Sequence, residues 1–223
     1  MARLLADLSS YIRSGSSLAQ QQRTVVHPAL PVPDLAPLLS ELPRGGITEI
    51  TGLRSSGRMA VLLHVLAQAT SRGEMCALLD THDQFSPASA HAAGVVLQQV
   101  IWIRGQNRPD HMLRAADLLL HGGGFGVIVL DLPDVAPEVW SRIPASWWYR
   151  FRRAAEHTPT ILLLCTGKAQ ARSCAQTSIE LTSFSVQWRG NTSFALLSRV
   201  QTIGHLRKPM GRPATPLSIR GVC

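Results

Sequence analysis

The residues from Gly52 to Met59 have types and a spacing suited to holding a phosphate group. Gly52 and Gly57 stand five positions apart, and Ser55 and Ser56 lie between them. Glycines let a loop wrap closely round an anion, and amides at the start of a helix supply hydrogen-bond donors. A short apolar strand precedes this loop and a helical pattern follows it, which is the order that a phosphate-binding loop requires.

Two positions of the loop carry side chains that are unsuited to nucleotide hydrolysis. A working loop ends with a lysine that reaches the terminal phosphates and a serine or threonine that binds Mg²⁺. This chain has Arg58 and Met59 there. The arginine fork is larger and differently aimed, and a thioether offers almost nothing to a cation that prefers oxygen. We expect no ATP or Mg²⁺ cofactor; the loop is either a plain connection or a residual site for phosphate, nucleotide or nucleic-acid backbone.

Alternating strand and helix patterns surround the loop. Apolar runs predict strands at 47–50, 75–80, 100–103, 127–131 and 160–165. Helical patterns lie at 57–72, 86–94, 109–121 and 141–156. Strands that are apolar throughout, with helices between them, predict an α/β fold whose mostly parallel central sheet is covered by helices on both faces. After this core, 179–189 and 193–205 predict an antiparallel C-terminal hairpin.

The two ends of the chain differ from this core. Leu4, Leu5, Leu8 and Ile12 stand at helical spacing and predict a short amphipathic helix that could dock on a partner or pack on its own core. A proline-rich stretch follows and resembles a linker. We therefore divide the chain into three parts, namely the N-terminal helix and linker (1–40), the core domain (41–205) and a basic, flexible tail (206–223).

The composition excludes some classes of protein. In 223 residues, Lys+Arg 22 against Asp+Glu 14 gives a formal charge of +8, which suits nucleic acid or an acidic protein partner. No apolar run is long enough to span a membrane, and Asp7 interrupts the N-terminal run, which argues against a secretory signal. Cys76 and Cys165 lie in apolar strands, so we expect buried thiols and a cytoplasmic location. The histidines show no metal-ligand spacing.

The core resembles a known family. The run ITEITGLRSSGRMAVLLHVLAQATSRGEMCALLDTHDQFSPASAHAAGV is similar to the nucleotide-binding core of the RecA recombinases. The order of loop, helix, strand ending in Asp80 and the turn with Pro87 matches as well. GVIVLDLPD falls where that family has its second acidic strand, with Asp131 in the metal-associated position. The resemblance implies a RecA-like three-layer fold with a vestigial acidic strand.

The departures from that family fall on catalytic positions. His82 stands where the resemblance places the water-activating glutamate, and the neighbouring Asp83 points elsewhere along the loop. Cys165 and Thr166 stand where the resemblance places a polar sensor. With Cys165 and Thr166 counted as one position, and with Arg58 and Met59 added, four catalytic positions are altered at once. The loss of all four predicts a pseudo-ATPase, that is, no enzyme activity.

Among RecA relatives with this kind of erosion, the chain resembles the ImuA proteins. It shares an N-terminal helix and linker, the entry HGGGFG into an apolar strand, and a hairpin followed by RKPMGRPATP. The resemblance implies a non-catalytic adaptor in SOS-induced translesion synthesis. Its partners would be an inactive Y-family polymerase homologue, an error-prone replicative-type polymerase and RecA. The alternatives are an ATP-dependent recombinase with an unorthodox loop and a SulA-like division inhibitor.

Three basic segments are candidate contacts for DNA or a partner protein. In the helix near 150, periodicity favours Trp147 and Phe151 for the core and leaves Trp148 with the arginines on a contact face. The loop 167–177 lies where the resemblance implies a DNA-binding loop, although an ordinary surface connection is equally consistent. The tail resembles a basic arm, or simple disorder. The candidates are Trp148, Arg150, Arg152, Arg153, Lys168, Arg172, Arg207, Lys208 and Arg212.

Overall fold

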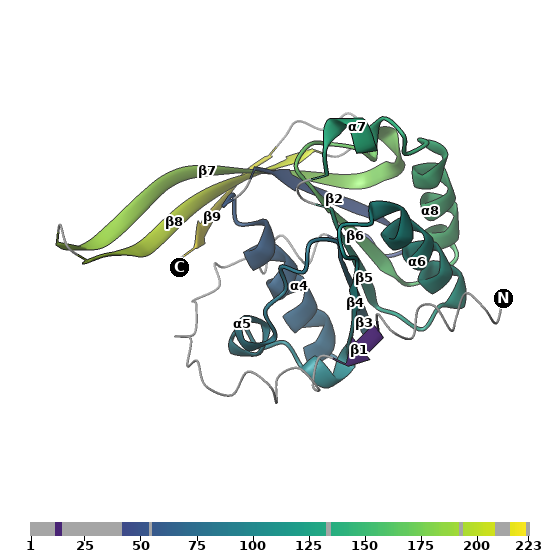
Figure 1. Cartoon of the computed structure of the whole chain (residues 1–223), viewed down its shortest axis with the longest axis horizontal. Helices are drawn as coiled ribbons and strands as arrows, with labels where there is room; N and C mark the ends of the chain where they lie inside the picture. The colour runs from purple at the N-terminus through teal and green to yellow at the C-terminus, as the bar shows by residue number, and fades with distance from the viewer. Residues whose placement is uncertain are drawn as a thin grey trace.

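A computed structural model describes residues 12–14, 42–53, 55–132, 135–191, 194–207 and 215–221, without the side chains of residues 12–14 or of those after 182. The described strands form one sheet in the order β1-β4-β3-β5-β6-β2-β7-β8-β9. The strands from β4 to β7 in this order run parallel, and β1, β8 and β9 are antiparallel to their neighbours. The predicted mostly parallel α/β sheet with an antiparallel C-terminal hairpin is therefore confirmed (Figure 1).

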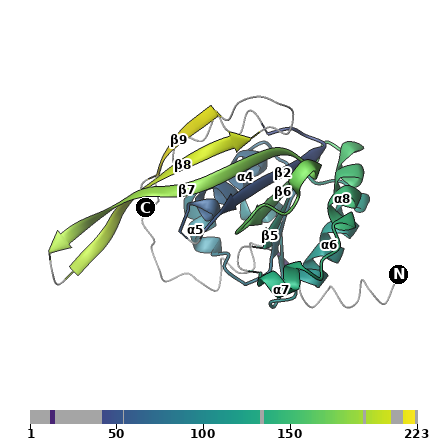
Figure 2. The same ribbon diagram turned by 90° about the horizontal axis from the view of Figure 1, so that it is seen from above.

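The strands follow the apolar runs closely. Their bounds are β1 Ile12–Ser14, β2 Gly46–Gly52, β3 Cys76–Asp80, β4 Val100–Arg104, β5 Val127–Leu132, β6 Ile161–Thr166, β7 Ala175–Asn191, β8 Phe194–Arg207 and β9 Thr215–Gly221. The second half of β7 continues past the parallel sheet and pairs only with β8, so that the two strands project from the body as a long hairpin (Figure 2).

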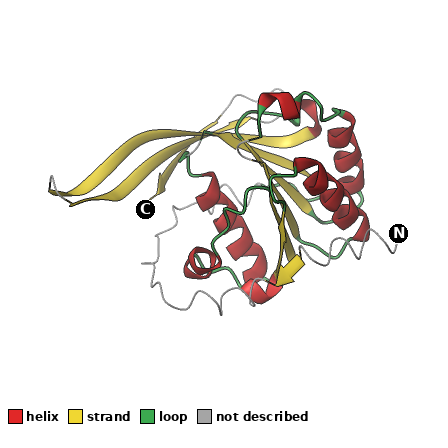
Figure 3. Cartoon of the chain, in the orientation of Figure 1, coloured by secondary structure: helices red, strands yellow, loops and turns green. Residues whose placement is uncertain are grey.

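Helices cover both faces of the parallel sheet (Figure 3). The helices are α4 Arg58–Ser71, α5 Pro87–Ala92, α6 Pro109–Gly122, α7 Pro137–Trp140 and α8 Ser146–Glu156, with short 3₁₀ turns η1 Leu97–Gln99 and η2 Arg172–Cys174. α4 and α5 lie on one face, and α6 and α8 lie on the other. This arrangement brings the start of α4, and hence the phosphate-type loop, to the carboxyl ends of the parallel strands.

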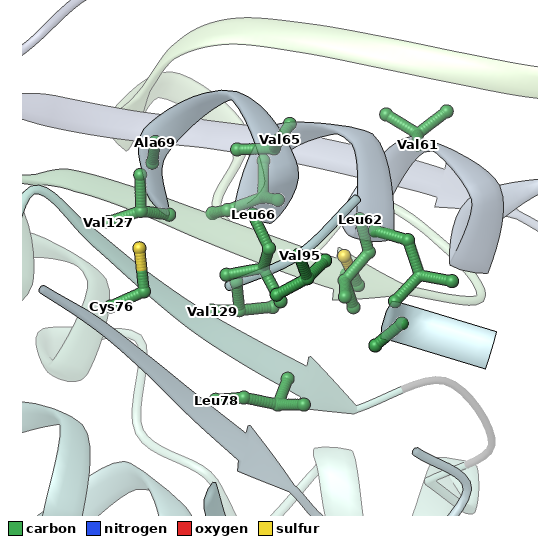
Figure 4. Close-up of a cluster of buried hydrophobic side chains, with 14 of the residues drawn as sticks. Val61, Leu62, Val65, Leu66, Ala69, Cys76, Leu78, Val95, Val127 and Val129 are labelled. Atoms are coloured by element: carbon green, nitrogen blue, oxygen red, sulfur yellow. The ribbon is translucent and has the colours of Figure 1, made fainter. Parts of the chain in front are cut away.

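Each face of the sheet has its own apolar core. On the α4 side, Leu62, Leu66 and Val129 are at most 1% exposed and pack together, as Figure 4 shows. On the other side, Phe151 of α8 is completely buried among side chains of α6 and the strands. Two cores on one sheet explain why the strands are apolar on both faces rather than alternating. The predicted buried thiols Cys76 and Cys165 lie in the α4-side core.

Three element predictions need correction. Ile12–Ser14 form strand β1, which pairs with Ile101–Ile103 of β4, so that the predicted N-terminal helix does not include Ile12. The helix expected at 141–156 begins only at Ser146, as α8; residues 141–145, which include Pro144, are not helical and separate it from the short helix α7. Proline lacks the amide that a continuous helix needs. Within the segment expected to be a tail, Thr215–Gly221 form β9 against β8.

Candidate functional site

The phosphate-type loop connects β2 to α4 through left-handed backbone positions. Ser55 has φ 62°, and Gly57, the residue before α4, has φ 92°. Glycine adopts the second of these conformations without strain. The Ser56 amide donates a hydrogen bond to the Leu53 carbonyl at 3.1 Å. That amide therefore closes a turn inside the loop instead of facing a bound anion.

The interior of the loop is filled by a side chain of the loop itself. Ser56 is 2% exposed. A Cβ added to Gly52 would lie 2.4 Å from the Ser56 hydroxyl oxygen and 2.7 Å from the Leu181 carbonyl oxygen of β7. Gly52 is thus required because a serine hydroxyl and a neighbouring strand approach its α-carbon closely.

Arg58 and Met59 begin α4 and differ in what they contact. Met59 is half-buried and packs on the α4-side apolar core. Arg58 is half-buried, and its Nη1 has no hydrogen-bond partner among the described residues. Burial raises the pKa of the Cys165 thiol well above its ordinary value; Asp131 adds to this rise and the Arg58 guanidinium opposes it. Arg58 and Asp131 therefore both lie within electrostatic range of Cys165.

Two aspartates stand side by side at the carboxyl edge of the sheet. Asp80 of β3 and Asp131 of β5 are register partners and are both buried. Asp80 accepts a hydrogen bond from the Phe85 amide at 2.8 Å, which fixes the turn after β3. Asp131, which the resemblance to RecA places in the metal-associated position, lies near the carboxyl end of β5.

The residues after Asp80 do not present a free carboxylate. His82 is half-buried, and its Nδ1 has no hydrogen-bond partner among the described residues. Asp83 is held by Arg104, whose Nε donates to Oδ1 at 2.5 Å while Nη2 pairs with Oδ2. Both carboxylate oxygens of Asp83 are therefore engaged by one guanidinium group. Asp83 is thus poorly placed to replace a glutamate general base.

This set of side chains fits a magnesium nucleotide poorly. The position that needs a hydroxyl ligand carries a thioether buried against apolar residues. Ser56 is buried in the loop, and its amide donates to the Leu53 carbonyl. Among the described residues, no group of three or more His, Cys, Asp or Glu side chains is arranged to hold a metal ion. Arg58 Nη1 and His82 Nδ1, which have no partner among the described residues, could hydrogen-bond an anion or water. The side chains described at this edge do not supply a complete set of oxygen ligands for Mg²⁺.

Glu49 is a site residue that the sequence reasoning missed. It is 1% exposed in the middle of β2, and its Oε1 accepts hydrogen bonds from the amides of Gln170 at 2.6 Å and Ala171 at 3.1 Å. Burial raises the pKa of the Glu49 carboxyl, and the two backbone hydrogen bonds and Thr166 partly offset the rise. Glu49 therefore fixes the crossover from β6 to β7. A lone acidic residue inside the apolar run ITEIT was the available signal.

The aromatic helix differs from its prediction at one position. Trp148, expected on a contact face, is 5% exposed and packs edge-on to Phe151 with ring centroids 5.9 Å apart. Trp147, predicted with Phe151 for the core, is half-buried, and Phe151 is in the core as predicted. Because α8 begins only at Ser146, the side of this helix that is buried is the one that carries Trp148, Phe151 and Ala155. Trp148 is therefore removed from the candidate contacts.

The arginines of α8 have different surroundings. Arg150 makes a bidentate ion pair with Asp117 of α6, with N···O distances of 2.6 and 2.5 Å, and thereby joins the two helices. Arg152 pairs with Glu156 at 2.9 Å. Arg153 is exposed and has no ion pair in the described part of the chain. Of the three, Arg153 is available to a partner without first breaking an internal contact.

The remaining candidates are spread over the chain. Lys168 and Arg172 are exposed on the crossover that Glu49 holds. Arg207 ends β8, and nothing further is described of its side chain. Leu4, Leu5, Leu8, Lys208 and Arg212 lie outside the described residues. No helix of the described chain is long and apolar enough to cross a membrane.

Comparison with known proteins identifies relatives of the core. A family model described as the RecA N-terminal domain matches residues 10–139, more than half of the chain. Protein RecA of Rhodospirillum rubrum is 37% identical over 98 residues, which cover 44% of this chain and 26% of the relative. Protein RecA of Lactobacillus delbrueckii subsp. bulgaricus is 35% identical over 120 residues, which cover 54% of this chain and 36% of the relative. The match thus spans about a quarter to a third of these relatives.

Proposed function

The chain belongs to the RecA N-terminal domain family, and from this premise we propose that it is a RecA-like adaptor that does not hydrolyse ATP. The proposed role is that of an ImuA-type protein in SOS-induced translesion synthesis. Its partners would be the inactive Y-family polymerase homologue, RecA and the error-prone replicative-type polymerase, with DNA as a further candidate. A cytoplasmic location agrees with this role.

One observation supports the loss of hydrolysis above the others. The two side chains that a working loop needs are replaced by Arg58 and by Met59, which packs into the apolar core. The Ser56 amide is also used within the loop, where it donates to the Leu53 carbonyl. Catalysis of phosphoryl transfer depends almost entirely on positioned cations and a positioned attacking water. A loop that lacks the hydroxyl ligand for the metal supports the adaptor role over the recombinase alternative.

The proposed role predicts a complex that needs no nucleotide. The full chain and the inactive Y-family polymerase homologue are purified, treated with apyrase and EDTA, and run together on a size-exclusion column. We expect them to co-elute, with the same apparent affinity after Mg²⁺ and ATP are added back. A complex that forms only with Mg²⁺ and ATP would contradict the proposal, and so would the lack of any complex. Binding to a division filament instead would favour the SulA-like alternative.

A further inference from the structure

The outer side of α8 and the adjacent 3₁₀ turn η2 form an exposed basic surface away from the phosphate-type loop. We call it the α8–η2 surface; it consists of Tyr149, Arg152, Arg153, Glu156 and Arg172. Tyr149 is 60% exposed and presents the apolar area of its ring to solvent. Arg153 and Arg172 are also exposed. The two arginines have no ion pair within the described residues.

Helical spacing places four of these residues on one side of α8. Residues three and four apart are neighbours on a helix, so Tyr149, Arg152, Arg153 and Glu156 form a continuous strip. The opposite side of the helix carries the buried residues Trp148, Phe151 and Ala155. η2 packs against α8; burial raises the pKa of the Cys174 thiol in η2, and the nearby Arg152 charge opposes that rise. The strip and Arg172 therefore belong to one surface.

Arg172 has an unfavourable backbone conformation. Its φ is 47°, in the left-handed region where non-glycine residues are uncommon. The amides just before it are fixed by Glu49, and Ala171 and Cys174 on either side are buried. Glycine would adopt this conformation without strain. Glu49 and the buried neighbours therefore hold the backbone at Arg172 in place, while its side chain is exposed.

We propose that the α8–η2 surface binds an acidic helical segment of a partner protein, with carboxylates on Arg153 and Arg172 and an apolar side chain against Tyr149. Guanidinium groups match carboxylates with two parallel hydrogen bonds, as Arg150 and Asp117 already show on the neighbouring side of α8. The inference rests on the proposed adaptor role, because it names one surface that such an adaptor would use.

The surface is less suited to nucleic acid. Single-stranded nucleic acid is usually held by several aromatic rings in a basic groove, whereas this surface presents one exposed ring on the outside of a helix. A short acidic helix needs only two cationic contacts and one apolar contact, and these are present.

The test uses the full chain and two fluorescent probes, namely a helical peptide with glutamates along one face and leucines beside them, and an oligo-dT. Binding is followed by fluorescence anisotropy at moderate and high salt. We expect the peptide to bind with micromolar affinity that weakens with salt, as expected for exposed charges. Arg153→Glu with Arg172→Glu should weaken peptide binding roughly tenfold or more. The matched control, Arg108→Glu just before α6 with Arg114→Glu on α6, makes the same charge change and should alter the peptide affinity about twofold at most.

A second variant separates binding from folding. Arg172→Gly removes the guanidinium and relieves the strained φ, so we expect a melting temperature no lower than that of the wild type together with weaker peptide binding. Equal peptide affinity in the surface variant and the α6 control would overturn the proposal, as would binding of oligo-dT alone or of neither probe. None of these outcomes affects the nucleotide-independent co-elution, so failure of this surface can be told from failure of the adaptor role.

Discussion

Replacing Gly52 with alanine is expected to lower the free energy of unfolding by about 2–3 kcal/mol, the upper part of the range for overpacking a tight site. The new Cβ would lie 2.4 Å from the Ser56 hydroxyl oxygen and 2.7 Å from the Leu181 carbonyl oxygen. The serine can rotate away only by leaving its buried position, and the carbonyl belongs to β7. Thermal denaturation should show a fall of roughly 2–4 °C for each kcal/mol.

Two further variants test the cause of that loss. At Gly122, the last residue of α6, an added Cβ meets nothing within 4 Å, so Gly122→Ala should change stability by less than about 1 kcal/mol, and in the stabilising direction. Adding Ser56→Gly to Gly52→Ala removes one of the two clashes and should recover part of the stability. If Gly52→Ala were as stable as Gly122→Ala, the loop would not be closed on Ser56 as described.

The second large effect is expected at Glu49. Glu49→Leu leaves the amides of Gln170 and Ala171 without their acceptor in a buried site, which should cost about 2–4 kcal/mol. Glu49→Gln keeps an oxygen acceptor for both amides and removes the buried charge, so it should be neutral or stabilising at neutral pH. Chemical denaturation of the two variants beside the wild type measures both effects.

The sign of the pH dependence follows from the raised pKa of Glu49, whose main cause is burial. The folded state favours the protonated carboxyl more than the unfolded state does. The stability that comes from Glu49 is therefore full below the ordinary pKa of a glutamate and is lost as the pH rises through the higher folded pKa. Glu49→Gln should lack this decline. An identical pH profile for the wild type and Glu49→Gln would show that the carboxyl is not buried as described.

The sequence predicted the strands and most helices because each strand is apolar on both faces, and only a sheet covered on both sides requires that pattern. It also predicted the loop that begins α4 from two glycines and the flanking periodicity. Trp148 was misplaced because the predicted core stripe joined Trp140 and Ile143 to Trp147 as if they stood on one helix. The chain is not helical between Trp140 and Ser146, so the spacing of the earlier residues does not carry over to α8. Periodicity reports which face a residue occupies only when the start of the helix is known.

Other parts of the candidate site depend on contacts between distant residues. The bond from Glu49 to Gln170 joins positions 121 apart, and no local pattern indicates it. The pairing of Ile12–Ser14 with β4 likewise depends on a free sheet edge that exists only after the core has folded. The strained φ of Arg172 follows from the short crossover that the sheet imposes on residues 167–174. Local sequence therefore predicts the helices and strands, whereas tertiary contacts decide which side chains are left exposed to bind a partner.

Whether this RecA-family chain uses ATP is decided by calorimetric titration of the full chain with ATP and Mg²⁺, together with a hydrolysis assay in the presence of single-stranded DNA. We expect neither micromolar binding nor turnover. Arg58→Lys with Met59→Thr should also fail to hydrolyse ATP, because His82 still stands where the resemblance to RecA places the general base. Micromolar binding of ATP by the wild type, with turnover that DNA stimulates, would show that the protein is an ATPase.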